Sequence, residues 1–306
     1  TVAIGVGAGK AHTTSNWGVY IGYEAGNDVT SGGQNVLIGG DAGAKITTAD
    51  RNIAIGGAAL QTSTAGDANT AVGDNAGWSA TTASGSVFLG RLAGGSLTTG
   101  NMNIAIGYDA MNGAATIGDN NIAIGVSAGD ALTGASGAVY IGKNAGGAAT
   151  NPGGWGGVII GHEAGAAIVN AEIVAIGRKA AYQMGGTGYG DFSTIVGTRA
   201  GETLGQSAGY VTLIGHNAGG DLTVASGSTF VGSGAGGTGT TGNRNVAVGY
   251  YPMMGGVTTG DQNIAIGSNT LDAVTSGNHN IVLGKDAGGA LTTGYNNVLL
   301  SPNTGA

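Results

Sequence analysis

The chain repeats a short apolar phrase that ends in glycine. NIAIG occurs at 52–56, 103–107, 121–125 and 263–267, and related phrases run through the rest of the 306 residues. Apolar triplets rich in β-branched residues and closed by glycine are typical of a short strand and its end. Of the 16 intervals between successive phrase-ending glycines, 10 are 17 residues long and the others are 16, 18, 19 or 20. The pattern therefore predicts a repeat architecture.

A 17-residue unit has no room for a helix of normal length in addition to a strand. We therefore expect an all-β parallel β-solenoid of about 17 residues per coil and 17–18 coils, whose strands stack about 4.8 Å apart into a rod. Glycine takes positive φ without steric cost, so the phrase-ending glycines should form the corner of each coil. The regular part of this series is Gly22, Gly39, Gly56, Gly73, Gly90, Gly107, Gly125 and Gly142.

The domain organisation follows from the repeat. Residues 1–306 are expected to form one repetitive solenoid domain, with irregular longer coils at 143–161 and 178–197. Because the first residues, TVAIG, already lie inside a repeat, we expect an excised segment of a longer fibre.

Positions within the coil have predicted roles. We expect the residues three and one before each glycine, such as Ile53 and Ile55, to face the interior. The alanine three after the glycine and the Val, Ile or Leu seven after it would fill the remaining interior. An asparagine precedes many strands, for example Asn35 and Asn52, and could form a stacked ladder that binds the backbone of a corner.

The middle residue of each strand would then face outward, yet no copy of it carries a charge. Strands that are apolar on both faces are typical of burial on both sides. The middle residues are therefore predicted to form an inter-chain stripe at the centre of a homo-oligomer. Its largest members are Tyr20, Leu37, Phe88, Tyr140, Ile159, Ile195, Leu213 and Phe230.

The phrases TTGNMNIAIGYDA, TIGDNNIAIGVSAG and LTTGYNNVLL resemble the repeats of phage tail-fibre-type proteins. They are also similar to the repeats in the head domains of trimeric autotransporter adhesins. The resemblance covers essentially the whole chain. It implies a left-handed β-roll in each chain and a homotrimer around a common axis.

Composition excludes several classes of protein. The 67 glycines occur with only 3 prolines and without a three-residue period, which excludes collagen. A mean hydropathy of +0.15 with only 9% charged residues is unlike the composition of a disordered chain. The net charge is −7, and the 10 Lys and Arg residues are spread along the chain without a basic cluster, so we expect no nucleic-acid partner. No run of 18 apolar residues occurs, so this segment should not insert into a membrane.

Candidate chemistry is sparse. Glycine clusters at 5–9 and 232–237 lack the strand–loop–helix context of a nucleotide site, so no cofactor is expected. The four histidines lie in different coils and are interpreted as solvated turn residues. Carboxylates that follow the corner glycines, such as Glu24 and Asp41, form either a solubilising edge or, alternatively, a stacked calcium site; we predict no metal. Thr-Thr pairs, such as Thr98-Thr99, raise the alternative of an ice-binding ladder.

Insertions in solenoids bulge from one side and often carry function. The two longer coils hold aromatic residues of the kind that stack on sugars or anchor protein contacts. They are assigned as a possible receptor-contact surface: Trp155, Tyr182, Tyr189 and Phe192.

These observations favour a structural protein over an enzyme. The sequence predicts a shaft or receptor-binding segment of a viral tail or capsid fibre, located at the virion surface or outside the cell, which contacts a host-surface glycan or protein. A bacterial surface adhesin of the trimeric autotransporter type is the alternative, and an ice-binding solenoid is a further one.

Overall fold

The structure is a computed structural model that describes residues 1–14, 17–113, 118–148, 156–168, 172–184, 192–205, 208–237, 241–255 and 258–300. The chain divides into two compact units, Thr1–Gly156 and Gly157–Ala306. Within the described residues, both units consist of strands, turns and bends without helices. Each unit is therefore all-β and is described by itself below.

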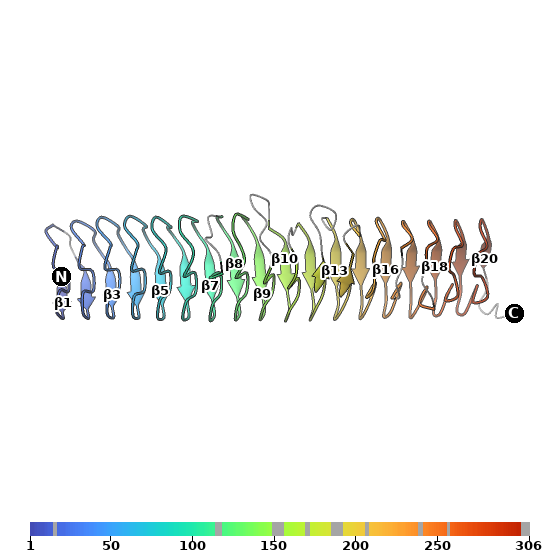
Figure 1. Cartoon of the computed structure of the whole chain (residues 1–306), viewed down its shortest axis with the longest axis horizontal. Helices are drawn as coiled ribbons and strands as arrows, with labels where there is room; N and C mark the ends of the chain where they lie inside the picture. Colours follow the sequence, from blue (N-terminus) through green and yellow to red (C-terminus); the bar gives the residue numbers. More distant parts are fainter. Residues whose placement is uncertain are drawn as a thin grey trace. The chain divides into compact units, whose positions relative to one another are not determined.

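The first unit contains one three-residue strand per coil (Figure 1). Its strands are β1 (Val2–Ile4), β2 (Val19–Ile21), β3 (Val36–Ile38), β4 (Ile53–Ile55), β5 (Thr70–Val72), β6 (Val87–Leu89), β7 (Ile104–Ile106), β8 (Ile122–Ile124) and β9 (Val139–Ile141).

The second unit repeats the same coil with one additional pair of strands. Its main strands are β10 (Val158–Ile160), β11 (Val174–Ile176), β13 (Thr194–Val196), β15 (Thr212–Ile214), β16 (Thr229–Val231), β17 (Val246–Val248), β18 (Ile264–Ile266), β19 (Ile281–Leu283) and β20 (Val298–Leu300). The additional strands, β12 (Gln183–Met184) and β14 (Thr203–Leu204), pair with each other in parallel. This pair begins in the longer coil predicted at 178–197.

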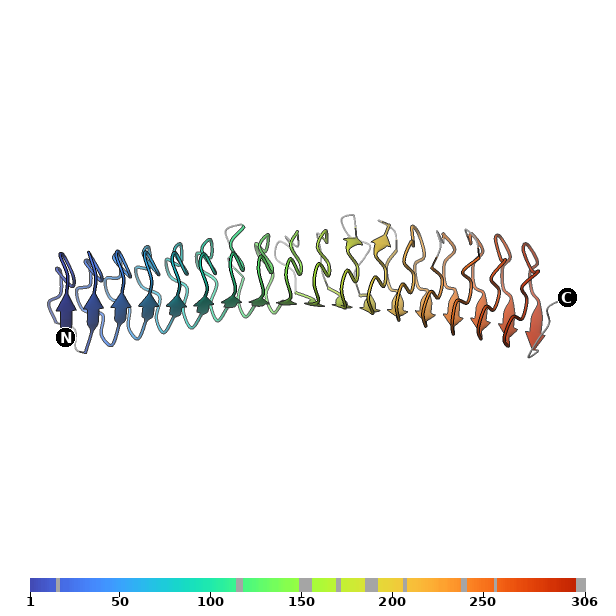
Figure 2. The ribbon, with the colours of Figure 1, turned by 90° about the horizontal axis from the view of Figure 1, so that it is seen from below.

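Successive strands within each unit are parallel and in register. Ile53 pairs with Thr70 and Ile55 with Val72, which places equivalent residues of neighbouring coils side by side. The strands occupy one side of each coil and the turns return on the other, as Figure 2 shows for both units. The predicted parallel β-solenoid of about 17 residues per coil is confirmed.

The corner glycines have a conformation that other residues rarely adopt. The eight glycines predicted to form corners all have φ between +128° and +140°. At Gly90, where φ is +131°, a Cβ atom would also lie 2.7 Å from the carbonyl oxygen of Gly107 in the next coil. Both the backbone conformation and the close approach of the next coil therefore require glycine at this position.

The predicted facing of the strands is wrong. From β2 to β19, the middle residue of every main strand is buried inside its own unit, and the two flanking residues are partly or fully exposed. Ile53 and Ile55 are each 38% exposed, whereas Ala54 between them is completely buried. The residues assigned to an inter-chain stripe are therefore core residues with no exposed surface: Tyr20, Leu37, Phe88, Tyr140, Ile159, Ile195, Leu213 and Phe230.

The other predicted interior positions are confirmed. Alanines three after the corner glycine, such as Ala25 and Ala93, are buried, as are Val29 and Leu97 seven after it. These side chains pack against the middle residues of the strands and complete a narrow core. That core explains why the middle residue points inward: the rest of the coil returns on that side.

An asparagine ladder runs beside the core, as predicted. The backbone N–H of Asn52 donates to Oδ1 of Asn35 (2.9 Å), and the N–H of Asn69 donates to Oδ1 of Asn52 (2.9 Å). The Asn52 Nδ2 also donates to the carbonyl of Gly66 across the coil. Ser86 replaces asparagine in the ladder and accepts from the N–H of Asn103 (3.1 Å). These buried side chains satisfy backbone groups that the short strands leave unpaired.

The size of the core residue varies from coil to coil, and a second position compensates. The compensating position is the fourth residue after each corner glycine. Around the large Phe88 this position is glycine in two successive coils, at Gly77 and Gly94. A Cβ at Gly77 would lie 2.6 Å from the Phe88 ring. Where the middle residue is Ala54, the residue four after its corner glycine is Leu60, which is fully buried. Volume is thus exchanged between two positions of the same coil, as close packing requires.

Candidate functional site

The first candidate surface is the outer face of the strands, formed by the residues three and one before each corner glycine. Every residue on this face is Val, Ile, Leu or Thr, and it carries no charge in either unit. All of these side chains are at least partly exposed. Because in-register pairing places equivalent side chains next to each other, the face forms two continuous uncharged rows in each unit. The rows are apolar except where β5, β13, β15 and β16 begin with threonine.

A second candidate surface lies at the corner that precedes each strand. We define the corner row as the residues five before the corner glycine, and the ladder row as the residues six before it. In the corner row, the non-glycine residues other than Glu172 adopt left-handed conformations with φ between +54° and +68°. The members of the row in the first unit are Trp17, Gln34, Arg51, Ala68, Gly85, Met102, Asn120, Gly137 and Gly156, and in the second unit Glu172, Phe192, Tyr210, Gly227, Arg244, Gln262, His279 and Asn296.

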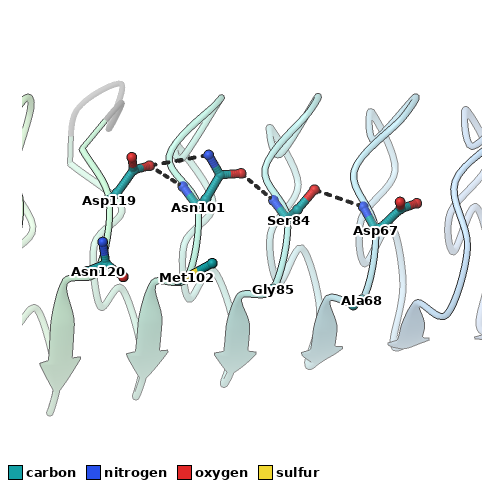
Figure 3. Close-up of a pocket in the computed structure, with 8 residues that line it drawn as sticks. All are labelled: Asp67, Ala68, Ser84, Gly85, Asn101, Met102, Asp119 and Asn120. Carbon is teal, nitrogen blue, oxygen red and sulfur yellow. Dashed lines mark hydrogen bonds between the residues drawn. The ribbon is translucent and has the colours of Figure 1, made fainter.

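The ladder row is held by hydrogen bonds that run opposite to those of the asparagine ladder (Figure 3). The backbone N–H of Asp67 donates to Oγ of Ser84 (3.0 Å), whose own N–H donates to Oδ1 of Asn101 (3.0 Å). The N–H of Asn101 donates to Oδ1 of Asp119 (2.6 Å). Each side chain of this row therefore holds the backbone of the preceding coil, which fixes the corner between the two ladders.

A groove of about 330 Å³ opens between the two rows in the first unit. Its polar wall is the ladder row from Asp67 to Asp119, and its other wall is the corner row at Ala68, Gly85, Met102 and Asn120 (Figure 3). The groove forms where the corner row has small residues: a Cβ at Gly85 would meet only Cγ of Met102, at 3.5 Å. Small residues in this row thus create recesses between longer side chains.

An aromatic pair occupies the corner row in the second unit. The rings of Phe192 and Tyr210 stack with their centroids 5.7 Å apart and their planes 20° apart. They are 61% and 64% exposed, respectively. Of the predicted receptor-contact residues, Phe192 therefore lies at the surface, beside Tyr210, which the sequence reasoning missed. A signal was present, because both aromatics stand five residues before a corner glycine.

The other predicted contact residues are not brought together with this pair. Tyr182 is partly buried, and its ring lies beneath the ammonium group of Lys179 at 4.7 Å. That ammonium also lies 3.8 Å from Glu163 and 3.7 Å from Glu202. Trp155 and Tyr189 lie outside the described residues.

Threonine hydroxyls form a third ladder. The hydroxyl of Thr47 donates to the carbonyl of Thr64 (3.1 Å), and the hydroxyl of Thr64 donates to the carbonyl of Thr81 (3.2 Å). The same pattern recurs in the second unit, where Thr275 donates to Thr292 (3.1 Å). These donors act within the solenoid, between one coil and the next.

Several side chains have raised pKa values. Burial raises the pKa of the Tyr140 phenol, which lies inside the core. A hydrogen bond with Glu24 raises the pKa of the exposed Tyr23, and partial burial raises the pKa of Asp130. No group of three His, Cys, Asp or Glu side chains able to hold a metal ion occurs among the residues that the structure describes. A search of the same residues for a helix long and apolar enough to cross a membrane found none.

Comparisons of the chain with family models, with curated proteins and with solved structures found no match. The geometry of the two surfaces is therefore the basis for assigning a function.

Proposed function

We propose that this chain is a structural segment of a viral tail or capsid fibre that associates with copies of itself and holds a host-contacting surface away from the virion. The observation that supports this proposal is the outer face of the strands. In each unit it presents consecutive pairs of uncharged side chains to solvent, and these are Val, Ile or Leu except for the threonines of β5, β13, β15 and β16.

Such a face is unfavourable in an isolated chain. Soluble monomers rarely expose contiguous apolar surface over more than a few hundred square ångströms. Covering one half-exposed Val or Ile stabilises a complex by on the order of 1 kcal/mol, and the same contribution repeats in every coil. A partner that matches this face must have the same coil-to-coil spacing, and a second copy of the same chain has it. Three copies around one axis is the arrangement implied by the resemblance to phage and adhesin repeats.

Sedimentation equilibrium tests the association. We expect a mass of three times the chain mass of 29.2 kDa. A variant with Ile53→Lys, Ile55→Lys, Ile104→Lys and Ile106→Lys should sediment as a monomer, because covering these charges would cost several kcal/mol. The matched control places four lysines in the corner row, at Gln34, Ala68, Met102 and Asn120, and should keep the wild-type mass. A monomeric wild type, or an oligomer that survives lysines on the outer face, would overturn the proposal.

The choice between a virus and a bacterial surface is tested by the coding sequence that flanks this segment. A self-cleaving chaperone domain after the repeats would support the viral fibre. A membrane anchor in the same position would instead assign the chain to a bacterial adhesin.

A further inference from the structure

The exposed aromatic pair in the corner row of the second unit has one open side. Phe192 covers one face of the Tyr210 ring. The next position of the row, one coil further along, is Gly227, which has no side chain to cover the other face. A Cβ at Gly227 would have a single neighbouring group within 4 Å, Cγ of Arg244 at 3.5 Å. Tyr210 and Arg244 therefore flank Gly227 in the corner row, one coil away on either side, and we call the space between them the slot.

The slot has the width of one ring. Neighbouring coils lie about 4.8 Å apart, so Tyr210 and Arg244, two coils apart, are separated by roughly 10 Å along the stack. Van der Waals contact on both sides of a ring takes up about 7–8 Å. The stem of Arg244 already reaches to 3.5 Å from the Cβ position of Gly227, so the space between the two side chains holds at most one six-membered ring.

The chemistry of the walls selects the ligand. The face of a tyrosine ring packs against the C–H face of a sugar, and the guanidinium group of arginine binds a carboxylate through two parallel hydrogen bonds. Within the described part of the chain, no salt bridge engages Arg244, which leaves its charge available. We propose that Tyr210, Gly227 and Arg244 form a subsite for a pyranose that carries a carboxylate, such as a uronic or sialic acid residue of a surface glycan. The subsite rests on the proposed function, since it identifies what the fibre would contact.

The groove of the first unit offers an internal comparison. It occupies the same two rows, but Met102 takes the place of an aromatic ring, and no lysine or arginine is among the residues that line it. A sugar carboxylate would find no cationic partner there. Met102, which is 64% exposed like Tyr210, is therefore the matched control position.

Saturation-transfer NMR on the full chain tests the subsite with three probes. Methyl glucuronide and sialyllactose should receive saturation, and methyl glucoside, which has a hydroxymethyl group in place of the glucuronide carboxylate, should bind at least about tenfold more weakly. Tyr210→Ala should weaken binding of the acidic probes by at least about tenfold, and Tyr210→Phe should preserve it. Arg244→Gln should weaken the binding of methyl glucuronide to the affinity of methyl glucoside. Met102→Ala should change nothing.

Gly227→Asn fills the slot without straining the backbone. Asparagine already holds the left-handed conformation at the equivalent positions Asn120 (φ +60°) and Asn296 (φ +57°). This variant should fold normally and lose the acidic probes. Absence of saturation transfer to both acidic probes, or binding that Tyr210→Ala and Gly227→Asn leave intact, would overturn the subsite.

Measuring the oligomeric mass of the same samples distinguishes failure of the subsite from failure of the proposed function. An oligomer that fails to bind would remove the subsite and leave the fibre assignment in place. A monomer that binds the acidic probes would keep the subsite and remove the self-association.

Discussion

The two faces of each strand are both apolar, yet they differ in how their residues vary along the chain. The inward position changes from alanine to leucine, phenylalanine and tyrosine, as in Ala54, Leu37, Phe88 and Tyr20. The outward positions hold almost the same β-branched residues in every coil. The inward face is closed by the chain's own returning loop, and the outward face is uncovered in each unit.

This difference shows how each face meets its neighbour. A core position can vary because a second residue of the same chain compensates, as Leu60 does for Ala54 and Gly94 does for Phe88. On a face that contacts another chain, no residue of the same coil can compensate for a change in side-chain size. If the partner repeats with the same spacing, each coil meets the same surface, and the same residues fit it in every coil. Uniform β-branched residues also suit the pleated surface of a sheet. The contrast therefore points to a repeating partner on the outer face.

The largest expected effect on stability comes from shortening an inward side chain, compared with shortening an outward side chain of the same strand. Phe88→Ala should reduce the free energy of unfolding by about 3–5 kcal/mol, because it leaves a cavity in a closed core. Leu89→Ala, on the adjacent outward residue, should cost less than about 1 kcal/mol in the dissociated chain and should instead weaken association. Denaturant unfolding at several protein concentrations measures both effects. Equal, concentration-independent losses would contradict the assignment of the two faces.

A double-mutant cycle tests the compensation. Leu60→Gly should cost about 2–4 kcal/mol by removing a buried side chain, and Ala54→Leu should cost about 1–3 kcal/mol by overpacking. Together they reproduce the natural combination of Leu37 with Gly43, so the double variant should regain most of the lost stability. Chemical denaturation gives the four free energies. Strictly additive losses would show that the two positions do not share volume.

The asparagine ladder at the border of the core gives a smaller effect. Asn52→Ala leaves the buried N–H of Asn69 and the carbonyl of Gly66 without their partner, which should cost about 1–3 kcal/mol. Asn52→Ser should cost less, because Ser86 already accepts from the next coil in the same ladder. Thermal unfolding of the two variants compares them. If serine were as damaging as alanine, the ladder would not depend on the accepting oxygen.

The smallest effect concerns a buried hydroxyl and is specific to alkaline pH. Burial raises the pKa of Tyr140 above the value of about 10 in the unfolded chain, so its stabilising contribution is complete below pH 10 and is lost as the pH rises further. Tyr140→Phe should therefore match or slightly exceed the wild type at pH 7 and should lose less stability between pH 10 and 12. The control is Tyr295→Phe at an exposed position, which should lose as much as the wild type over this range. Denaturation at the two pH extremes provides the comparison.

Much of the fold could be predicted because it depends on local rules. The corner glycines, the buried alanines and the asparagine ladder each require a residue type that the repeat displays directly. The facing of the strands could not be read from the strand alone, because a three-residue strand that is apolar throughout has no polar side to orient it. The deciding signal lay elsewhere in the coil: Ala54 occurs with Leu60, and Leu37 occurs with Gly43.

The candidate site was only partly accessible from sequence. Phe192 lies in one of the longer coils and could be predicted from its sequence. Tyr210 lies outside the two longer coils, and its place beside Phe192 in the corner row became apparent only in the structure. The slot beside Tyr210 depends on a missing side chain, at Gly227, and on Arg244 two coils away. In a chain with 67 glycines, the sequence alone does not distinguish a glycine that leaves a recess from the glycines that the backbone requires.

Site-specific cross-linking tests most directly whether the outer face is covered by another copy of the chain. The chain has no cysteine, so Ile106→Cys on the outer face and Ala105→Cys in the core of the same strand can be compared without background. With a short bis-maleimide, Ile106→Cys should yield covalently linked chains on a denaturing gel, and Ala105→Cys should remain a single chain of 29.2 kDa. Single chains from Ile106→Cys at every protein concentration, with its thiol freely alkylated, would contradict the account.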